Sequence, residues 1–230
     1  MARSAHSDVL DQIGRRIANG DLVPATVMTL ADLEAEYEAS RTVIRETVRV
    51  LESIGMVQSR RRVGITVCPT EDWDWFDAHL IRWNLTGPKR KAQLETLMEL
   101  RIAVEPTAAR LAASRASRAQ GEELVRLAVE MESLGECLRG RSAEYLADDM
   151  AFHTLLLDSS GNRMFNTLAK PVRETLRGRV ELGLMPAKPI DASLRGHVYA
   201  AQAVLDRDPD AAERCTSDLL KAINEEIAAE

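Results

Sequence analysis

Residues 40–57 constrain the fold most strongly, because they combine an apolar helical stripe with a cationic one. Apolar side chains recur three and four positions apart over residues 43–54, which places them on one face of an α-helix. Ser40 is a good N-cap for this helix, and Gly55 ends it. Three arginines follow one another at intervals of four on a different face: Arg41, Arg45 and Arg49. The segment therefore predicts a helix that exposes three guanidinium groups, which suit phosphate oxygens or guanine edges.

The residues before this helix favour a second, shorter one. Leu30, Leu33 and Tyr37 recur at helical spacing, and we expect this helix to end at Ala39. Two helices joined by so tight a corner form a helix-turn-helix.

The residues after Gly55 favour a β-hairpin, or wing. We expect strands at 56–59 and 65–68, joined by a turn at 60–64 that carries Arg60, Arg61, Arg62 and Gly64. The alternative is that these arginines only form a solvent-exposed surface without a binding role. The helix pair, the N-cap, the spacing of the arginines and the basic hairpin together favour DNA binding.

The net charge of −6 is distributed unevenly along the chain. Residues 1–70 hold nine arginines and nine acidic residues, so the rest of the chain carries the whole deficit. A basic patch on a neutral domain can still bind DNA by releasing counterions.

Two further observations point to a cytoplasmic protein. No run of about 18 apolar residues could span a bilayer, and residues 1–11 lack the apolar core of a secretion signal. The three cysteines are widely spaced and odd in number, which favours reduced side chains over disulfides or a metal knuckle.

The chain predicts a mainly α protein with two domains. Residues 1–69 form the winged helix-turn-helix, residues 70–89 a connector rich in acidic and aromatic side chains, and residues 90–230 a helical domain. Within the last part, Ser, Gly and Pro residues separate six expected helices: 90–114, 119–138, 142–158, 162–182, 190–207 and 209–228. Short loops between them predict an antiparallel bundle.

One group of polar residues in the bundle has the chemistry of a metal site. Asp149 and His153 are four apart, so they share a helix face, and His197 lies on the fifth expected helix. A carboxylate and two imidazoles suit zinc, nickel or manganese. The alternative is a surface Asp-His pair with a hydrogen-bonded core histidine. Arg101 borders an apolar stripe, so an inward guanidinium would need Glu105 or a ligand carboxylate.

The quoted motifs are similar to those of the GntR transcription regulators, in their FadR-like branch with an FCD ligand-binding domain. The resemblance covers nearly the whole chain, and the 73–83 connector looks most like that of the sugar-acid subgroup, particularly galactonate-operon repressors. It implies a homodimer that binds double-stranded operator DNA and is released by a small carboxylate effector, a sugar acid. The residues of this chain that match the family's motifs fall in both parts. In the DNA-binding part they are Ser40, Arg41, Thr42, Arg45, Gly55 and Gly64, and in the helical part they are Arg101, Asp149, His153, Asn162 and His197.

The resemblance assigns roles and also exposes departures. Arg41 and Arg45 would contact bases or phosphates, Thr42 a phosphate, and Gly64 at the wing tip the minor groove. Ala31 stands where the family usually has an arginine, and Arg62 where it usually has a glycine. We therefore expect the hairpin to carry more of the DNA affinity here than in the family.

The resemblance also bears on the metal and the effector. Metal-binding members supply a further histidine from the last helix, where this chain has Asp218 and Leu219. Asp149, His153 and His197 remain as ligands, with Asp218 as a substitute if the register shifts by one. Without metal, Arg101, Asn162 and the two histidines would bind a polyhydroxy acid directly.

Three hypotheses follow from the sequence. The first is an effector-released repressor of sugar-acid catabolism genes. The second is a constitutive DNA-binding protein whose helical domain only dimerises. The third, and weakest, is a metal-dependent enzyme, since no nucleophile elbow or phosphate-binding loop is present.

Overall fold

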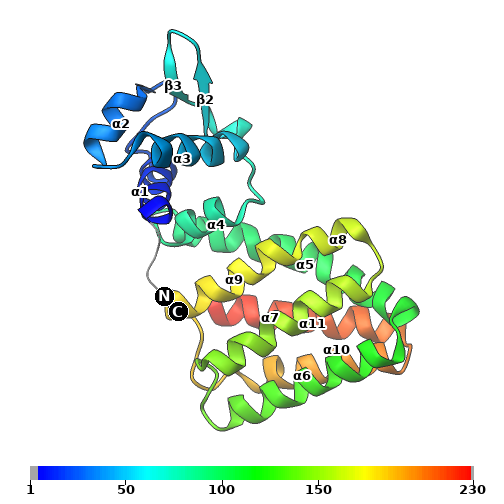
Figure 1. The fold of residues 1–230 in the computed structure, drawn as a ribbon. Coiled ribbons are helices and arrows are strands. Elements are labelled where there is room, and N and C mark those ends of the chain that lie inside the picture. Colours follow the sequence, from blue (N-terminus) through cyan, green and yellow to red (C-terminus); the bar gives the residue numbers. More distant parts are fainter. Residues whose placement is uncertain (1–4, 229–230) are drawn as a thin grey trace. The chain divides into compact units, whose positions relative to one another are not determined.

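The computed structural model describes residues 5–228, and the chain divides into two compact units, residues 1–93 and 94–230. The elements of the first unit are α1 (Ala5–Asn19), β1 (Val27–Met28), α2 (Leu30–Glu36), α3 (Arg41–Ser53), β2 (Val57–Arg60), β3 (Gly64–Val67), the 3₁₀ turn η1 (Thr70–Asp72) and α4 (Ala78–Leu85) (Figure 1). The helices that follow are α5 (Arg90–Arg115), α6 (Arg118–Glu136), α7 (Ala143–Ser159), α8 (Arg163–Thr167), α9 (Ala169–Glu181), α10 (Asp191–Leu205) and α11 (Pro209–Ala228). This confirms the predicted mainly α fold.

The helix-turn-helix is confirmed as α2 and α3. The Thr29 hydroxyl accepts a hydrogen bond from the Asp32 amide, and the Asp32 carboxylate accepts one from the Thr29 amide, which caps α2. Ser40 caps α3 as expected, accepting from the Val43 amide at 3.4 Å. Helix α2 ends three residues earlier than predicted, because Glu38 adopts a left-handed conformation (φ 47°) in the corner.

The wing is a hairpin of β2 and β3, and β1 adds a third strand that the sequence analysis missed. The sheet order is β1-β3-β2, and Arg60 pairs with Gly64 in the antiparallel register. Arg60 and Gly64 therefore end the strands, which corrects the predicted turn at 60–64 and the placement of Gly64 at the wing tip. Only residues 61–63 form the turn. Strand β1 escaped prediction because two residues are too few to show an alternating pattern.

Helix α1 was not predicted either, and it packs against α3 and α4. Residues 70–89, expected as a connector, contribute Leu80 and Trp83 to the core of the first unit, where both are fully buried. The Trp83 indole N–H donates to Asp11 of α1 at 3.0 Å, and a methyl group on Gly14 would lie 2.2 Å from the indole ring. Glycine at this position therefore lets α4 dock closely on α1.

The second unit is a bundle in which α10 packs against both α6 and α11, and α7 packs against both α6 and α9 (Figure 1). Ala109, Ala112 and Ala113 of α5 join its aliphatic core. The helix expected at 162–182 is two helices, α8 and α9, separated at Leu168. Pro171 favours a new helix start at this point, since it has no N–H for the Thr167 carbonyl and fits best in the first turn of a helix.

None of the helices within residues 5–228 combines the length and the apolar character that a membrane crossing requires.

Candidate functional site

The basic residues of the first unit surround one groove. It measures about 680 Å³ and lies between α3 and the wing. Its lining includes seven of the eight residues predicted to bind DNA: Arg41, Arg45, Arg49, Arg60, Arg61, Arg62 and Gly64. The eighth, Thr42, is exposed in the first turn of α3. The fold therefore gathers a helix and a hairpin with the same charge around one opening.

The cations of this groove are held loosely by acidic neighbours. Arg49 is 2.5 Å from Glu46 and Arg41 is 3.9 Å from Glu34, and in both pairs the side chains are partly or largely exposed. Exposed ion pairs are worth about 0–1 kcal/mol, so phosphate can replace these carboxylates. Glu52 has a different task, since it accepts a hydrogen bond from the Ser59 amide at 2.7 Å and ties α3 to the wing.

Two residues of the wing have left-handed backbones. Arg62 has φ 67° in the turn, a conformation that glycine adopts without strain and arginine does not. Gly64 has φ 117°, and a Cβ there would lie 2.7 Å from the Met28 carbonyl oxygen of β1. The chain thus accepts backbone strain at position 62, where it gains a cation.

The bundle brings together the three predicted metal ligands. Asp149 and His153 of α7 and His197 of α10 are all buried, and one ligand atom from each lies within 4.8 Å of the others. Asp149 Oδ1 is 3.2 Å from His153 Nε2 and 3.7 Å from His197 Nε2, and the two Nε2 atoms are 3.4 Å apart. Ligand atoms bound tetrahedrally to zinc are separated by roughly 3.3 Å, given metal–ligand distances of about 2.0–2.1 Å. The spacing fits one metal ion.

The neighbours of the two Nδ1 atoms determine which nitrogen of each imidazole faces this centre. Nδ1 of His197 donates to the Ser193 carbonyl at 2.7 Å, and Nδ1 of His153 faces Glu105 Oε2 at 2.7 Å. Both Nε2 atoms therefore face Asp149 Oδ1, and in the unprotonated imidazoles they offer lone pairs to a cation bound there. Two imidazole nitrogens and a carboxylate oxygen thus converge in a buried space, an arrangement that suits a divalent cation.

Burial and neighbouring charge act in opposite directions on these groups. Burial disfavours the charged form of Asp149, but the two histidines outweigh it and hold the pKa of Asp149 below its usual range. Burial also disfavours ionisation of Glu105, yet Arg101 and His153 lower the pKa of Glu105 to about 2. Burial lowers the pKa of His197. The two carboxylates are thus anions in the bundle interior.

Arg101 turns inward, with its side chain fully buried on α5. Its Nε donates to Glu105 Oε1 at 2.6 Å, so the internal partner considered from the sequence is present. Its Nη2 lies 3.0 Å from His153 Nε2. Among the described residues, Nη1 finds no acceptor. Arg101 therefore joins the centre with one donor unused.

Two other predicted residues lie elsewhere. Asn162 caps α8, accepting from the Met164 amide at 3.0 Å. It is nine residues beyond His153 and follows the end of α7 at Ser159. Asp218 is exposed on α11 while Leu219 is buried, which corrects the suggested substitution, because that register points the leucine inward.

Sequence reasoning missed two contributions to the centre. Glu105 was considered only as a partner of Arg101, yet it also orients His153. The Phe152 ring stands edge-on to both histidines, with centroids 5.2 Å and 5.1 Å away. The sequence carries no signal for the contacts of Glu105 with His153 and of Phe152 with His197, because each joins helices that are far apart in the chain.

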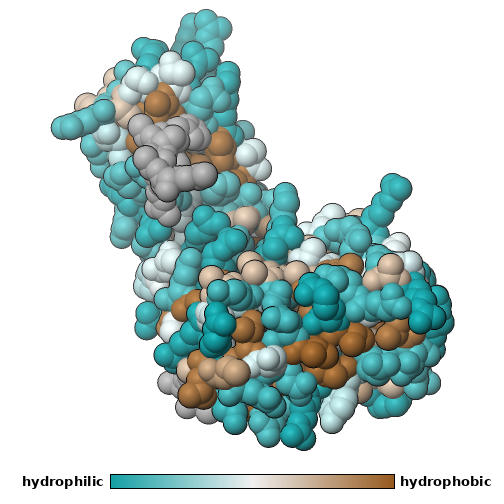
Figure 2. Space-filling model, turned by 60° about the horizontal axis from the view of Figure 1, so that its bottom comes forward, coloured by the Kyte–Doolittle hydropathy of each residue, from teal (hydrophilic) through white to brown (hydrophobic). Residues whose placement is uncertain are grey.

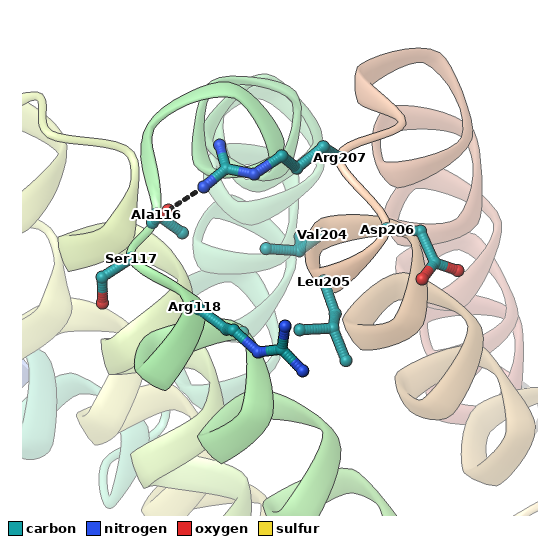
Figure 3. Close-up of a pocket in the computed structure, with 8 residues that line it drawn as sticks. Ala116, Ser117, Arg118, Val204, Leu205, Asp206 and Arg207 are labelled. Atoms are coloured by element: carbon teal, nitrogen blue, oxygen red, sulfur yellow. Dashed lines mark hydrogen bonds between the residues drawn. The ribbon is translucent and has the colours of Figure 1, made fainter.

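A separate hollow of about 380 Å³ lies where the α5–α6 turn meets the end of α10 (Figure 3). Arg207 donates to the Ala116 carbonyl at 3.3 Å, and Arg118 pairs with Glu122 at 2.8 Å. The Ser117 hydroxyl already caps α6. The polar groups that line this hollow are therefore already used to join the helices. The polar centre at Asp149 is the better ligand site.

Comparisons with known proteins match both units. Residues 5–67 match the family described as bacterial regulatory proteins, gntR family, and residues 96–222 match the FCD domain. The HTH-type transcriptional regulator YieP of Escherichia coli is 31% identical over 160 residues, which cover 69% of each chain. The galactonate operon transcriptional repressor of Escherichia coli is 26% identical over 210 residues, or 90% of each chain.

The fold also matches solved structures. A structure of Lar, which controls the expression of the Listeria monocytogenes agr system, superimposes with a TM-score of 0.64. The match covers 100% of this chain and 99% of that one at 16% sequence identity, so it supports the fold alone.

Proposed function

The chain belongs to the GntR family of bacterial regulatory proteins and carries an FCD domain, and from this premise we propose that it represses sugar-acid catabolism genes. It is a DNA-binding transcriptional regulator and not an enzyme, which removes the third hypothesis. In our proposal a small carboxylate such as galactonate or gluconate releases it from operator DNA. The name of the galactonate operon repressor supports this effector class.

The groove between α3 and the wing is the DNA-binding surface in this proposal. Arg41, Arg45 and Arg49 of α3 enter the major groove, where arginine reads guanine and contacts phosphate. Thr42 contacts a phosphate. Arg60, Arg61, Arg62 and the backbone at Gly64 let the wing follow the neighbouring minor groove. The wing supplies as many cations as the helix, which compensates for Ala31.

The observation that carries the effector proposal is the buried centre of Asp149, His153 and His197 beside the unused donor of Arg101. These three residues would hold one zinc, nickel or manganese ion. A bound divalent ion supplies a Lewis acid that attracts a carboxylate oxygen. His153 Nε2 cannot bind a metal and Arg101 together, so metal binding frees the Nη2 N–H that now meets His153, while Nη2 keeps its contact with Glu105 Oε2 at 3.4 Å. This N–H and the unpartnered Nη1 are then available for a carboxylate.

In our proposal the helical unit also forms a homodimer, and its exposed apolar residues support this. Figure 2 shows brown, apolar residues gathered in a band across this unit. Exposed apolar side chains of the unit include Val129 on α6 and Tyr199 on α10. Contiguous exposed apolar surface commonly marks a protein interface. A twofold dimer would present two recognition helices to the half-sites of a palindromic operator.

Effector release requires that the acid bind the DNA-incompetent state better than the DNA-bound state. A difference of about 3 kcal/mol between the two states lowers operator affinity about a hundredfold. We expect galactonate or gluconate to raise the melting temperature of the metal-loaded protein and to release a labelled operator fragment in fluorescence anisotropy. A chelator should abolish both effects, and a panel of aldonic and uronic acids identifies the preferred one.

The alternative is a constitutive DNA-binding protein whose helical domain only dimerises. The contacts of Glu105 with Arg101 and His153 favour it, since they satisfy part of the polar centre without any ligand. If no acid changes operator binding, either with or without metal, this alternative is correct.

A further inference from the structure

A second buried arginine carries a donor that the proposed site does not use. Arg179 of α9 is 2% exposed, and among the described residues its Nε finds no acceptor. Among the described residues, Arg179 forms an ion pair with Glu226 of α11 at 3.5 Å, which is at the outer limit of a hydrogen bond. A buried charged donor without an acceptor is costly, so an acceptor is missing from this space.

Arg179 lies on α9, which packs against α7, the helix that carries Asp149 and His153. Burial opposes its charge and lowers the pKa of Arg179, the carboxylate of Asp149 counters this, and the charge of Arg101 adds to it. Arg101 on α5 and Arg179 on α9 are therefore two buried guanidinium groups that interact with the same buried charges. Each keeps one nitrogen without an acceptor among the described residues.

The charges of this interior indicate what it can accept. Apart from Glu174, whose charge is paired with that of Arg177, the buried or nearly buried charges of the helical unit are those of Arg101, Arg179, Glu105, Asp149 and Glu226. With neutral histidines they leave an excess of one negative charge, and a divalent cation changes it to one positive charge. One carboxylate restores neutrality, so the acceptor for Arg179 is best an uncharged oxygen such as a hydroxyl.

We propose that Arg179 is a specificity-determining residue, whose Nε–H donates to a hydroxyl oxygen at the end of a polyhydroxy monocarboxylate remote from its carboxylate. This inference rests on the proposed function and extends it: Arg101 and the metal bind the acid group, and Arg179 reads the length of the hydroxylated chain. A short hydroxy acid makes the contacts of its carboxylate with Arg101 and the metal, but it has no distant hydroxyl for Arg179.

The variant Arg179→Lys tests this step, because lysine keeps the charge opposite Glu226 and has no N–H at the Nε position. Calorimetry on the zinc-loaded full chain compares galactonate with glycerate, which has the same acid end and a shorter chain. We expect Arg179→Lys to weaken galactonate binding about tenfold and glycerate binding less than twofold. Zinc affinity and melting temperature should stay close to those of the wild type.

Equal losses for both acids, or no loss for either, would overturn the role of Arg179 while the proposed function stands. Failure of the wild type to bind either acid would overturn the proposed function and this inference with it. If Arg179→Lys does not fold, the double variant Arg179→Met/Glu226→Gln removes both buried charges, and the same selective loss of galactonate binding is expected.

Discussion

Nδ1 of His153 lies 2.7 Å from Oε2 of Glu105, so the negative charge of a carboxylate on α5 favours a proton on this nitrogen of an imidazole on α7. The same carboxylate accepts from Arg101 one turn earlier on its own helix. Glu105 thereby orients two residues that the proposed site uses for different purposes, His153 toward a metal and Arg101 toward an acid. A single buried carboxylate links the two halves of the site.

This link predicts the behaviour of Glu105→Gln. The amide oxygen can still accept from Nδ1 of His153, but the negative charge that favours the N–H tautomer and balances Arg101 is lost. We expect zinc affinity to fall about 10- to 100-fold, as for other partners of metal-ligating histidines. Competition with a chromophoric chelator measures this. Glu99→Gln, exposed on the same helix, is the matched control, and equal zinc affinity in both variants would show that Glu105 does not act on the centre.

Arg45 tests the recognition helix. Its side chain is exposed on α3, so Arg45→Ala removes a DNA contact without disturbing the core. We expect operator affinity to fall by about 1–3 kcal/mol, with the melting temperature and acid-induced stabilisation unchanged. Arg118→Ala removes an exposed arginine of the helical unit as the control. Unchanged operator binding by Arg45→Ala in an anisotropy titration would contradict the assignment of α3.

Replacing Arg62 by glycine should change the stability of the protein and its affinity for operator DNA in opposite directions. Arg62→Gly relieves a left-handed backbone at φ 67°, so we expect a gain of roughly 0.5–1 kcal/mol in the free energy of unfolding. It also removes a cation from the wing, so operator affinity should fall and its salt dependence should become shallower by about one unit.

Arg61→Gly is the matched control for Arg62→Gly. It removes the same charge at a neighbouring turn position that is not among the residues with positive φ. We expect it to weaken DNA binding similarly and to lower stability slightly. Urea unfolding separates the two variants, and a loss of stability in Arg62→Gly would show that strain is not stored there.

The parts of the structure that sequence predicted are those set by local pattern. The apolar spacing and the Ser40 cap defined α3, and the i,i+4 spacing placed Asp149 and His153 on one face, because both depend only on helix geometry. The break before α9 was also within reach, since Pro171 carries its signal in the sequence. Contacts such as Glu105 with His153, or the approach of Trp83 to Gly14, depend on how distant helices pack, and no local pattern encodes them.

His79 gives the first unit a pH dependence that is independent of the metal centre. Its Nδ1 is 3.2 Å from the Asp77 carboxylate, and this hydrogen bond raises the pKa of His79 against the opposing effect of burial. Asp11 also favours the protonated form, and Arg82 disfavours it. Asp77 caps α4 through the amides of His79 and Leu80, so the ion pair stabilises the start of that helix.

Because the folded-state pKa of His79 is raised, its stabilisation is fully present below the unfolded pKa of about 6.5 and is lost as pH rises through the folded value. We expect the free energy of unfolding of the wild type to exceed that of His79→Gln at pH 5.5 and to converge with it in mildly alkaline solution. The side chain is 43% exposed, so the difference should stay below about 1 kcal/mol. The imidazole centroid lies 5.7 Å from that of Trp83, whose fluorescence should report the same titration. Asp77→Asn keeps the cap and removes the charge, and it should abolish both signals; a pH-independent difference between wild type and His79→Gln would refute the ion-pair explanation.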